Sequence, residues 1–309
     1  MPRPAEPALR FAYNTNGLRE HDGPSAIRLL ARLGYDAVEL SLLEQHYDPL
    51  RGSPTQLRDI QAALRETGLD VVVGAGVPLA LSDERFEPSL FHPDPEGRAL
   101  RQRFLEASID LAAELRSRCL VFCTGVRRPE VDPAQALAWL DEGLATLCHH
   151  GATRDVRIAL EPEPGHLIES LEDYRSLQAR VGPALGLTLD VGHVVCTESK
   201  PPAAVIAGVL AEEHPDHVQI EDIRDRKHEH LPFGEGEIDF PPILQTFINA
   251  GYAGHLGVEL SRHSHEADRR AAESLAFLRR ASRYHKECSR PGSGISGRRE
   301  RLPSPADCS

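Results

Sequence analysis

Residues 156–190 read VRIALEPEPGHLIESLEDYRSLQARVGPALGLTLD, and the order of apolar and polar residues in this stretch predicts the fold. A short β-rich run at 156–160 is followed by a segment with apolar residues at helical spacing, and a second β-rich run follows at 186–190. Two strands separated by a helix must run parallel. The stretch therefore predicts a strand–helix–strand unit of a parallel sheet.

The same unit recurs along most of the chain. Eight β-rich runs, each followed by an amphipathic segment, lie at residues 9–15, 35–40, 69–73, 119–123, 156–160, 186–190, 217–220 and 255–260. Eight such units most simply close into a (β/α)₈ TIM barrel of the α/β class, and a doubly wound sheet is the alternative. The first run is followed by NTNGLREHDG, which lacks the G-x-G-x-x-G fingerprint of a dinucleotide-binding sheet, so the barrel is favoured.

Length and composition agree with one barrel domain. The chain has 309 residues, and we place the domain at 1–285 and a disordered tail, rich in Gly, Pro, Ser and Arg, at 286–309. Lys and Arg number 35 against 47 Asp and Glu, which gives a net charge of −12 and argues against nucleic acid as a partner.

The sequence contains no apolar run long enough to span a membrane, so we expect no membrane partner. The first ten residues, MPRPAEPALR, lack the apolar core of a signal peptide, and a cytoplasmic location is expected. The six cysteines are sparse and lack zinc-ribbon spacing, so we interpret them as reduced structural thiols.

Candidate site residues follow the last four predicted strands. These strands end in IALEPEPGH, LTLDVGH, HVQIEDIRD and GVELSRHSH, which place Glu161, Asp190, Gln219 and Glu259 at the end of the barrel where active sites lie. Three buried carboxylates at one point would repel one another unless a cation pairs with them. Three carboxylates and an amide oxygen suit one divalent metal ion, Mn²⁺, Mg²⁺ or Co²⁺.

These motifs, together with HEHLPFGEGEIDF, resemble those of the xylose isomerase-like TIM barrel superfamily over about residues 9–280. Its sugar isomerases, epimerases and dehydratases include tagatose 3-epimerase, inosose isomerase and 3-dehydroshikimate dehydratase. The resemblance implies that Glu161, Asp190 and Glu259 bind the metal and that His193 lines the site.

The fourth ligand departs from the pattern. Many members have H-x-H-x-x-D or H-x-H-x-x-E on strand seven with the second His as ligand, whereas this chain has Gln219 there, as the dehydroshikimate dehydratase branch tolerates. His217 is the rival ligand on the same face, but Gln219 is closer to the strand end and is favoured. An arginine that some epimerases place six residues later is replaced by Asp225, with Arg224 beside it as a substrate-binding candidate.

The resemblance implies a metal-dependent isomerase or epimerase that moves a proton next to the carbonyl of a small polyhydroxy ketone, either a ketose or a keto-cyclitol. The metal would stabilise the enediolate, while Glu161 and Glu259 would remove and return the proton. The alternative is a dehydratase, a lyase of the 3-dehydroshikimate or keto-cyclitol type, with His193 as the acid. Relatives with this fold commonly pair, so a homodimer is one expectation.

Further candidates for contact with the substrate lie at other predicted strand ends and loops: Glu163, His230, His46, His228, His166, Glu39, Asn14 and Asn16. Glu39 is equally suited to hold the barrel together. Two other classes remain open: a metal-free binding barrel, and a nuclease like endonuclease IV. The nuclease needs more histidines and a basic face than this acidic chain offers.

Overall fold

The computed structural model describes residues 9–288. Most of the segment 286–309, which we expected to be a disordered tail, therefore lies outside the described residues. Its first three residues are placed, and they end the last helix, α9 (Ala267–Cys288).

Eight parallel strands form a closed barrel in the order β1-β10-β7-β6-β5-β4-β3-β2, and each overlaps a range predicted from the sequence to within two residues at its ends. The predicted TIM barrel is therefore confirmed. The strands are β1 (Arg10–Asn14), β2 (Ala37–Ser41), β3 (Asp70–Gly74), β4 (Cys119–Phe122), β5 (Arg157–Leu160), β6 (Leu185–Asp190), β7 (His217–Ile220) and β10 (His255–Val258).

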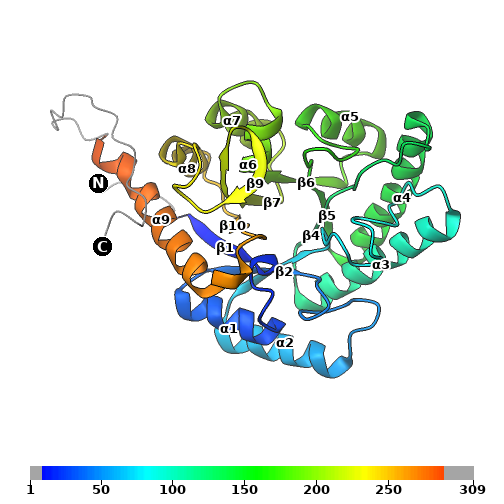
Figure 1. Ribbon diagram of the computed structural model, residues 1–309, viewed down its shortest axis with the longest axis horizontal. Coiled ribbons are helices and arrows are strands. Elements are labelled where there is room, and N and C mark those ends of the chain that lie inside the picture. The colour runs from blue at the N-terminus through cyan, green and yellow to red at the C-terminus, as the bar shows by residue number, and fades with distance from the viewer. Residues whose placement is uncertain (1–8, 289–309) are drawn as a thin grey trace.

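Helices surround the barrel (Figure 1). They are α1 (Gly23–Leu33), α2 (Pro54–Thr67), α3 (Pro95–Leu115), α4 (Pro133–Arg154), α5 (Leu171–Val181), α7 (Pro202–Glu212), α8 (Phe240–Asn249) and α9. Polar caps begin several of them; for example, Ser170 and Asp173 form a reciprocal capping box at α5. Between helices and strands lies the main apolar core, while Val72, Cys119, Val121 and Ala159 form a separate cluster on the opposite strand faces, inside the barrel.

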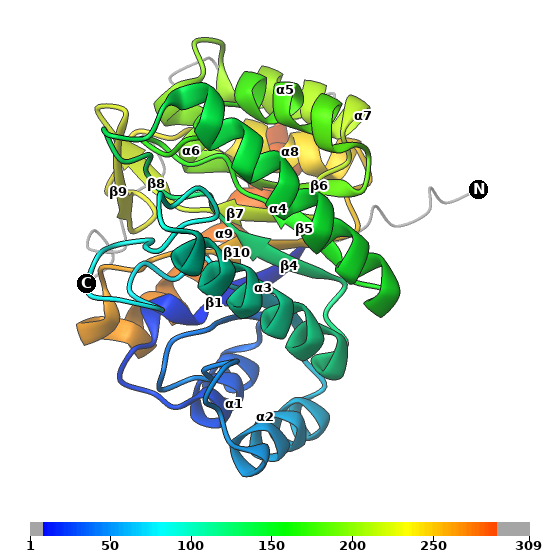
Figure 2. The ribbon, with the colours of Figure 1, turned by 90° about the vertical axis from the view of Figure 1, so that its right-hand side faces the viewer.

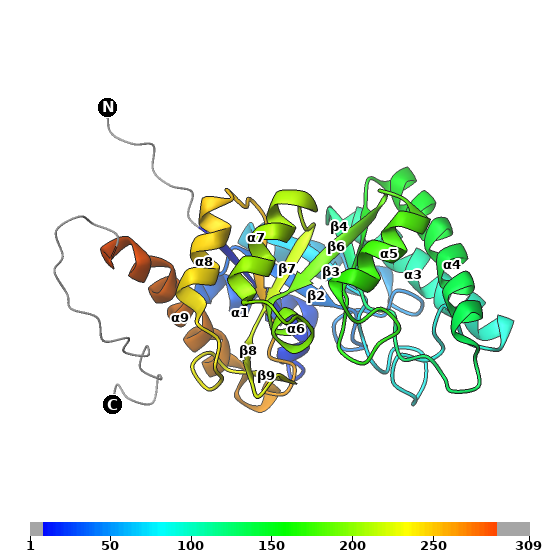
Figure 3. The same cartoon turned by 90° about the horizontal axis from the view of Figure 1, so that it is seen from above.

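A short helix and a hairpin near the C-terminal end of the barrel were not expected. One is the short helix α6 (Val191–Thr197), which begins where β6 ends. The other is an antiparallel hairpin of β8 (Asp222–Arg224) and β9 (Lys227–Leu231), where we expected a loop. Figures 2 and 3 show the hairpin, α6 and the loop after β10 at the same end of the barrel.

The hairpin is held by the buried carboxylate of Asp222. Its Oδ2 accepts hydrogen bonds from the backbone N–H groups of Gly234 (2.8 Å) and Gly236 (2.9 Å), and its Oδ1 accepts one from Ile238 (3.1 Å). A Cβ atom at position 236 would collide with this carboxylate, so only glycine fits there. The loop that follows the hairpin is thereby fixed against the barrel end.

Within the described residues, no single helix is both long and apolar enough to cross a membrane; α6 and α7 meet the length and composition criteria only as a pair bent by 117°.

Candidate active site

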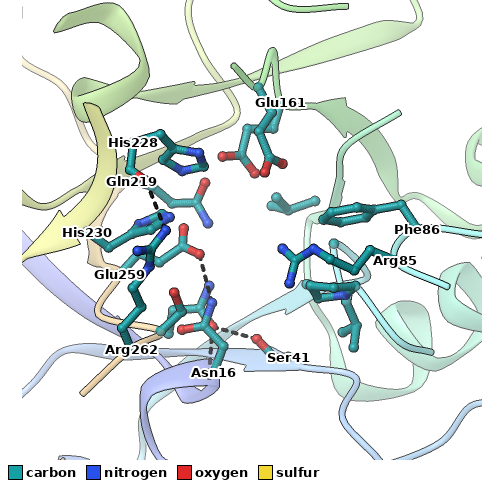
Figure 4. Close-up of a pocket in the computed structure, with 18 of the residues that line it drawn as sticks. Asn16, Ser41, Arg85, Phe86, Glu161, Gln219, His228, His230, Glu259 and Arg262 are labelled. Carbon is teal, nitrogen blue, oxygen red and sulfur yellow. Dashed lines mark hydrogen bonds between the residues drawn. The ribbon is translucent and has the colours of Figure 1, made fainter. Parts of the chain in front are cut away.

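A cavity of about 720 Å³ lies at the C-terminal end of the barrel. Its walls come from residues at the ends of β1, β2, β5, β7 and β10, from the loop after β3 and from β9. Glu161, Gln219 and Glu259 line it together with the predicted substrate contact His230 (Figure 4). Glu163, another predicted substrate contact, also lines it.

Glu161 and Glu259 extend into this cavity from β5 and β10 (Figure 4). Burial raises the pKa of Glu161 well above its usual value, and the nearby carboxyl of Glu259 raises it further. The pKa of Glu259 is also raised well above its usual value, by burial first and then by Glu39 and Asp190. Asn16 Nδ2 donates a 2.7 Å hydrogen bond to Glu259 Oε1 and so orients that side chain.

Asp190 ends β6 and does not itself line the cavity, but it lies directly behind Glu161 and His193. One ligand atom from each of Glu161, Asp190 and His193 lies within 4.8 Å of the other two. Asp190 Oδ1 accepts a 2.7 Å hydrogen bond from the His193 backbone N–H and begins α6, while its Oδ2 is buried with no partner among the described residues. One carboxylate oxygen is therefore fixed. The carboxyl also lies within hydrogen-bonding reach of Glu221, and a cation would take the place of that contact.

Only one of the two polar atoms in the Gln219 side chain has a hydrogen-bond partner. Its Nε2 donates to Glu39 Oε1 (3.0 Å), and its buried Oε1 has no partner in residues 9–288. The register pairs Gln219 with Asp190 across β7 and β6, which brings the two unpartnered oxygens to neighbouring strand ends. His217, the rival ligand, instead lies 2.9 Å from Glu39 Oε2 through its Nε2 and does not line the cavity.

These observations fit a divalent cation. Such an ion needs oxygen donors whose lone pairs are not already used, and Asp190 Oδ2 and Gln219 Oε1 are buried donors of that kind. It would also relieve the repulsion among the buried carboxyls, whose pKa values are raised by burial and by one another's charge. Glu161, Asp190 and His193 form a candidate metal site.

We predict that Gln219→Leu weakens binding of a divalent cation by about tenfold or more, because the amide oxygen is lost. His217→Leu should instead leave the cation affinity unchanged and lower the free energy of unfolding by about 3 kcal/mol, because Glu39 Oε2 then stays buried without its partner. Titration calorimetry and chemical denaturation measure the two effects. Loss of the metal in the His217 variant alone would identify His217 as the ligand.

Three histidines gather beside the carboxyls: His193, His228 and His230. Burial lowers the pKa of His193 to about 4, so its ring is neutral at neutral pH. His193 Nδ1 lies 3.0 Å from the Pro162 carbonyl oxygen, which can only accept, so Nδ1 carries the proton. His193 Nε2 therefore presents a lone pair, 3.0 Å from His228 Nε2.

Glu163 lines the cavity two residues after Glu161. Burial is the main cause that raises its pKa to about 7, so its carboxyl titrates near neutral pH. His166 Nδ1 lies 3.6 Å from Glu163 Oε2.

Two predicted substrate contacts, His46 and Arg224, are corrected by the structure. His46 is fully buried, and its Nδ1 lies 3.0 Å from Thr15 Oγ1. This contact holds the segment after β1 in place and does not reach the cavity. Arg224 is exposed on β8 and donates to the backbone carbonyl of Glu235. Neither side chain lines the cavity, and neither is retained as a substrate contact.

Glu221 is a buried acid that was not among the residues predicted for the site. It is 0% exposed, and neither carboxyl oxygen has a partner within the described part of the chain. Burial raises its pKa well above the usual value, and the neighbouring Asp190 raises it further. A Cβ atom at position 192 would collide with it, which explains Gly192. Glu221 could have been predicted from its position two residues after Gln219, because residues two apart in a strand lie on the same face.

The raised pKa values predict how metal binding changes stability with pH. In the metal-free protein, Glu161 and Glu259 bind protons more tightly when folded than when unfolded, so stability falls as pH rises above about 4.5 towards their folded pKa values. A cation replaces those protons and binds more tightly at higher pH. We expect a fixed Mn²⁺ concentration, 100-fold above the Kd at pH 8, to raise Tm by about 5 °C at pH 8 and by less at pH 5.5.

Calorimetry of chelator-treated protein with and without Mn²⁺ measures this difference. A larger gain at pH 5.5 than at pH 8 would contradict the assignment of these carboxyls to the metal site.

Comparisons with known proteins give the evolutionary context of this site. The model of the family described as xylose isomerase-like TIM barrel matches residues 27–281. An inosose dehydratase from Yersinia enterocolitica is 27% identical over 165 residues, which cover 47% of this chain and 53% of that relative. The chain thus matches about half the length of this relative. A putative L-ribulose-5-phosphate 3-epimerase from Escherichia coli is 25% identical over 77% of this chain and 83% of its own.

Solved structures share the fold. A D-tagatose 3-epimerase-like protein superposes with a TM-score of 0.71 at 20% identity, over 88% of this chain and 99% of that protein. The D-psicose 3-epimerase of Clostridium cellulolyticum H10 also has a TM-score of 0.71, at 17% identity and the same coverage. The closed barrel, the strand-end acids and a family match over most of the length lead to one conclusion: this chain belongs to the xylose isomerase-like TIM barrel family.

Proposed function

We propose that this protein is a metal-dependent isomerase or epimerase that moves a proton on the carbon next to the carbonyl of a ketose or keto-cyclitol. The observation that supports the proposal most directly is that Glu161 and Glu259 face the same cavity, beside the candidate metal site, with pKa values raised by burial (Figure 4). The family and its epimerase relatives favour the same chemistry.

The metal ligands in this proposal are Glu161, Asp190, Gln219 and Glu259, with Mn²⁺, Mg²⁺ or Co²⁺ as the ion. When bound, the ion supplies positive charge beside the substrate carbonyl, which makes the neighbouring proton more acidic. One of the two glutamates removes that proton and the other returns one, and Asn16 holds Glu259 in place for this step. His193, neutral with a lone pair on Nε2, accepts a hydrogen bond or coordinates rather than donating a proton.

A dehydratase is the second candidate, and two observations favour it. Gln219 occupies the position where Gln is tolerated in the dehydroshikimate dehydratase branch, and a match to an inosose dehydratase covers about half of that relative. A carboxyl with a raised pKa can also protonate a departing hydroxyl. In this chain the acid would then be Glu161 or Glu259 and not His193.

One experiment separates the two reactions. Metal-loaded protein is incubated in deuterated water with a panel of ketoses, keto-cyclitols and 3-dehydroshikimate, and products are followed by NMR and ultraviolet absorbance. Exchange of deuterium next to the carbonyl with an epimeric product supports the isomerase, whereas new absorbance from a conjugated or aromatic product supports the dehydratase. Absence of metal-dependent exchange and of elimination on every compound would count against both.

A further inference from the structure

Three arginines line the cavity at its outer end. Arg19 lies in the loop after β1, Arg85 in the loop after β3 and Arg262 in the loop after β10. Figure 4 shows the guanidinium groups of Arg85 and Arg262 reaching towards the cavity from opposite sides. All three are exposed residues, and none of them forms an ion pair with a carboxylate in residues 9–288. The outer end is therefore cationic, although the chain carries a net charge of −12.

The contacts of these arginines leave most of their donors available. Arg262 Nη2 donates to the His228 carbonyl oxygen (3.0 Å), and Arg19 Nε donates to the Asn16 carbonyl oxygen (3.2 Å). The Arg85 guanidinium carbon lies 5.5 Å from the centre of the Phe86 ring. A guanidinium has five N–H donors, so each arginine can still bind a second group through a planar pair of donors.

The two arginines line the same cavity as His228, although their loops lie 177 residues apart in the sequence. Ser264, two residues after Arg262, also lines the cavity, and its hydroxyl oxygen is buried without a partner in the described range.

The inner end of the cavity is lined by acids instead. The acids Glu39, Glu161 and Glu259 line it there, at the strand ends that we assign to the metal and to proton transfer. A neutral ketose would need hydrogen-bond partners at the outer end but no positive charge. Guanidinium groups match phosphate and carboxylate, which accept two parallel hydrogen bonds from one arginine.

We propose that Arg85 and Arg262 bind an anionic group of the substrate, a phosphate monoester or a carboxylate, at the end remote from the reacting carbonyl. This inference rests on the proposed function for the position of the carbonyl. It narrows the substrate class from polyhydroxy ketones in general to polyhydroxy ketones with a terminal anion. Arg19 and Ser264 supply further donors at the same end.

The test compares matched neutral and anionic ligands. Titration calorimetry with the metal-loaded protein gives Kd for D-ribulose and D-ribulose 5-phosphate, for D-fructose and D-fructose 6-phosphate, and for 5-keto-D-gluconate, whose anion is a carboxylate. We expect an anionic member to bind at least tenfold more tightly than its neutral counterpart. Arg85→Met and Arg262→Met should each weaken that binding by about tenfold and leave the neutral ligands unchanged.

Arg103→Met is the matched control, because Arg103 is an exposed arginine of α3 that does not line the cavity. This variant should bind every ligand as the parent does. The two anions are distinguished by which Kd rises in the arginine variants: that of the sugar phosphates indicates a phosphate, and that of 5-keto-D-gluconate indicates a carboxylate. Equal affinities for the neutral and anionic members of every pair, or anion affinities that neither substitution changes, would overturn the proposal.

Deuterium exchange on the same ligands separates failure of this proposal from failure of the proposed function. Exchange on neutral ketoses that is unaffected by Arg85→Met and Arg262→Met would retain the isomerase and reject the anion site. Arginine-dependent binding of the anionic ligands without exchange or elimination would retain the anion site and reject the reaction.

Discussion

Glu161→Gln and Glu259→Gln should each lower the rate of deuterium exchange on the substrate by about 1,000-fold, because each removes one of the two groups that we propose to carry the proton. An amide has nearly the same size as a carboxyl but does not transfer a proton at neutral pH. The folded protein should tolerate both changes, since each eliminates an acid whose ionisation is disfavoured by burial. The rate of deuterium incorporation is measured by stopping the reaction at successive times and analysing the substrate by NMR.

Glu142→Gln provides the control, because Glu142 is exposed on α4 and remote from the cavity. It should exchange deuterium at the parental rate. If Glu161→Gln and Glu259→Gln retained more than a tenth of the parental rate with unchanged metal content, the two glutamates would not be the proton-transfer pair.

Asp190→Asn should weaken divalent cation binding by roughly 100-fold or more, because it removes a negative charge and one buried carboxylate oxygen from the candidate metal site. The substitution should spare α6, since asparagine can accept the hydrogen bond of the His193 backbone N–H as aspartate does. Metal content after dialysis and the titration of chelator-treated protein measure the loss. Tm of the metal-free variant should not fall below that of the metal-free parent.

Asp132→Asn makes the same chemical change in the same structural role without touching the site. Asp132 begins α4, and its Oδ1 accepts hydrogen bonds from the backbone of Ala134 and Gln135, both at 3.0 Å. This variant should bind the cation with parental affinity. Parental affinity in Asp190→Asn as well would remove Asp190 from the ligand set.

The barrel was predictable because its evidence is local. Each strand and each long helix repeats its own apolar pattern, and the strand–helix alternation then leaves little choice of topology. The hairpin β8–β9 was missed because KHEHL carries no apolar alternation, and its shape depends on the bonds that Asp222 makes 12 to 16 residues away. Helix α6, with seven residues, is too short to show a helical period.

Some residues of the candidate site could likewise be predicted from the sequence, and others could not. Strand-end residues such as Glu161 and Gln219 could be placed because a parallel barrel brings all such ends to one side. Arg85 and Arg262 could not be placed from the sequence, because they lie in loops and no periodic pattern of residues predicts the path of a loop. The difference between His46, which is buried behind the site, and His230, which lines it, also depends on packing between distant segments.

The sequence by itself determined the barrel, the family resemblance and the acids at the strand ends, because these follow from short-range patterns and motifs. Only the tertiary structure decided that Gln219 and not His217 faces the cavity with an unused oxygen, that Glu221 lies beside Asp190, and that a cationic outer end lies opposite an acidic inner end. These features arise when barrel closure brings together residues far apart in the chain. Closure also removes their charged groups from water, and this burial shifts their pKa values and determines which ligands they can bind.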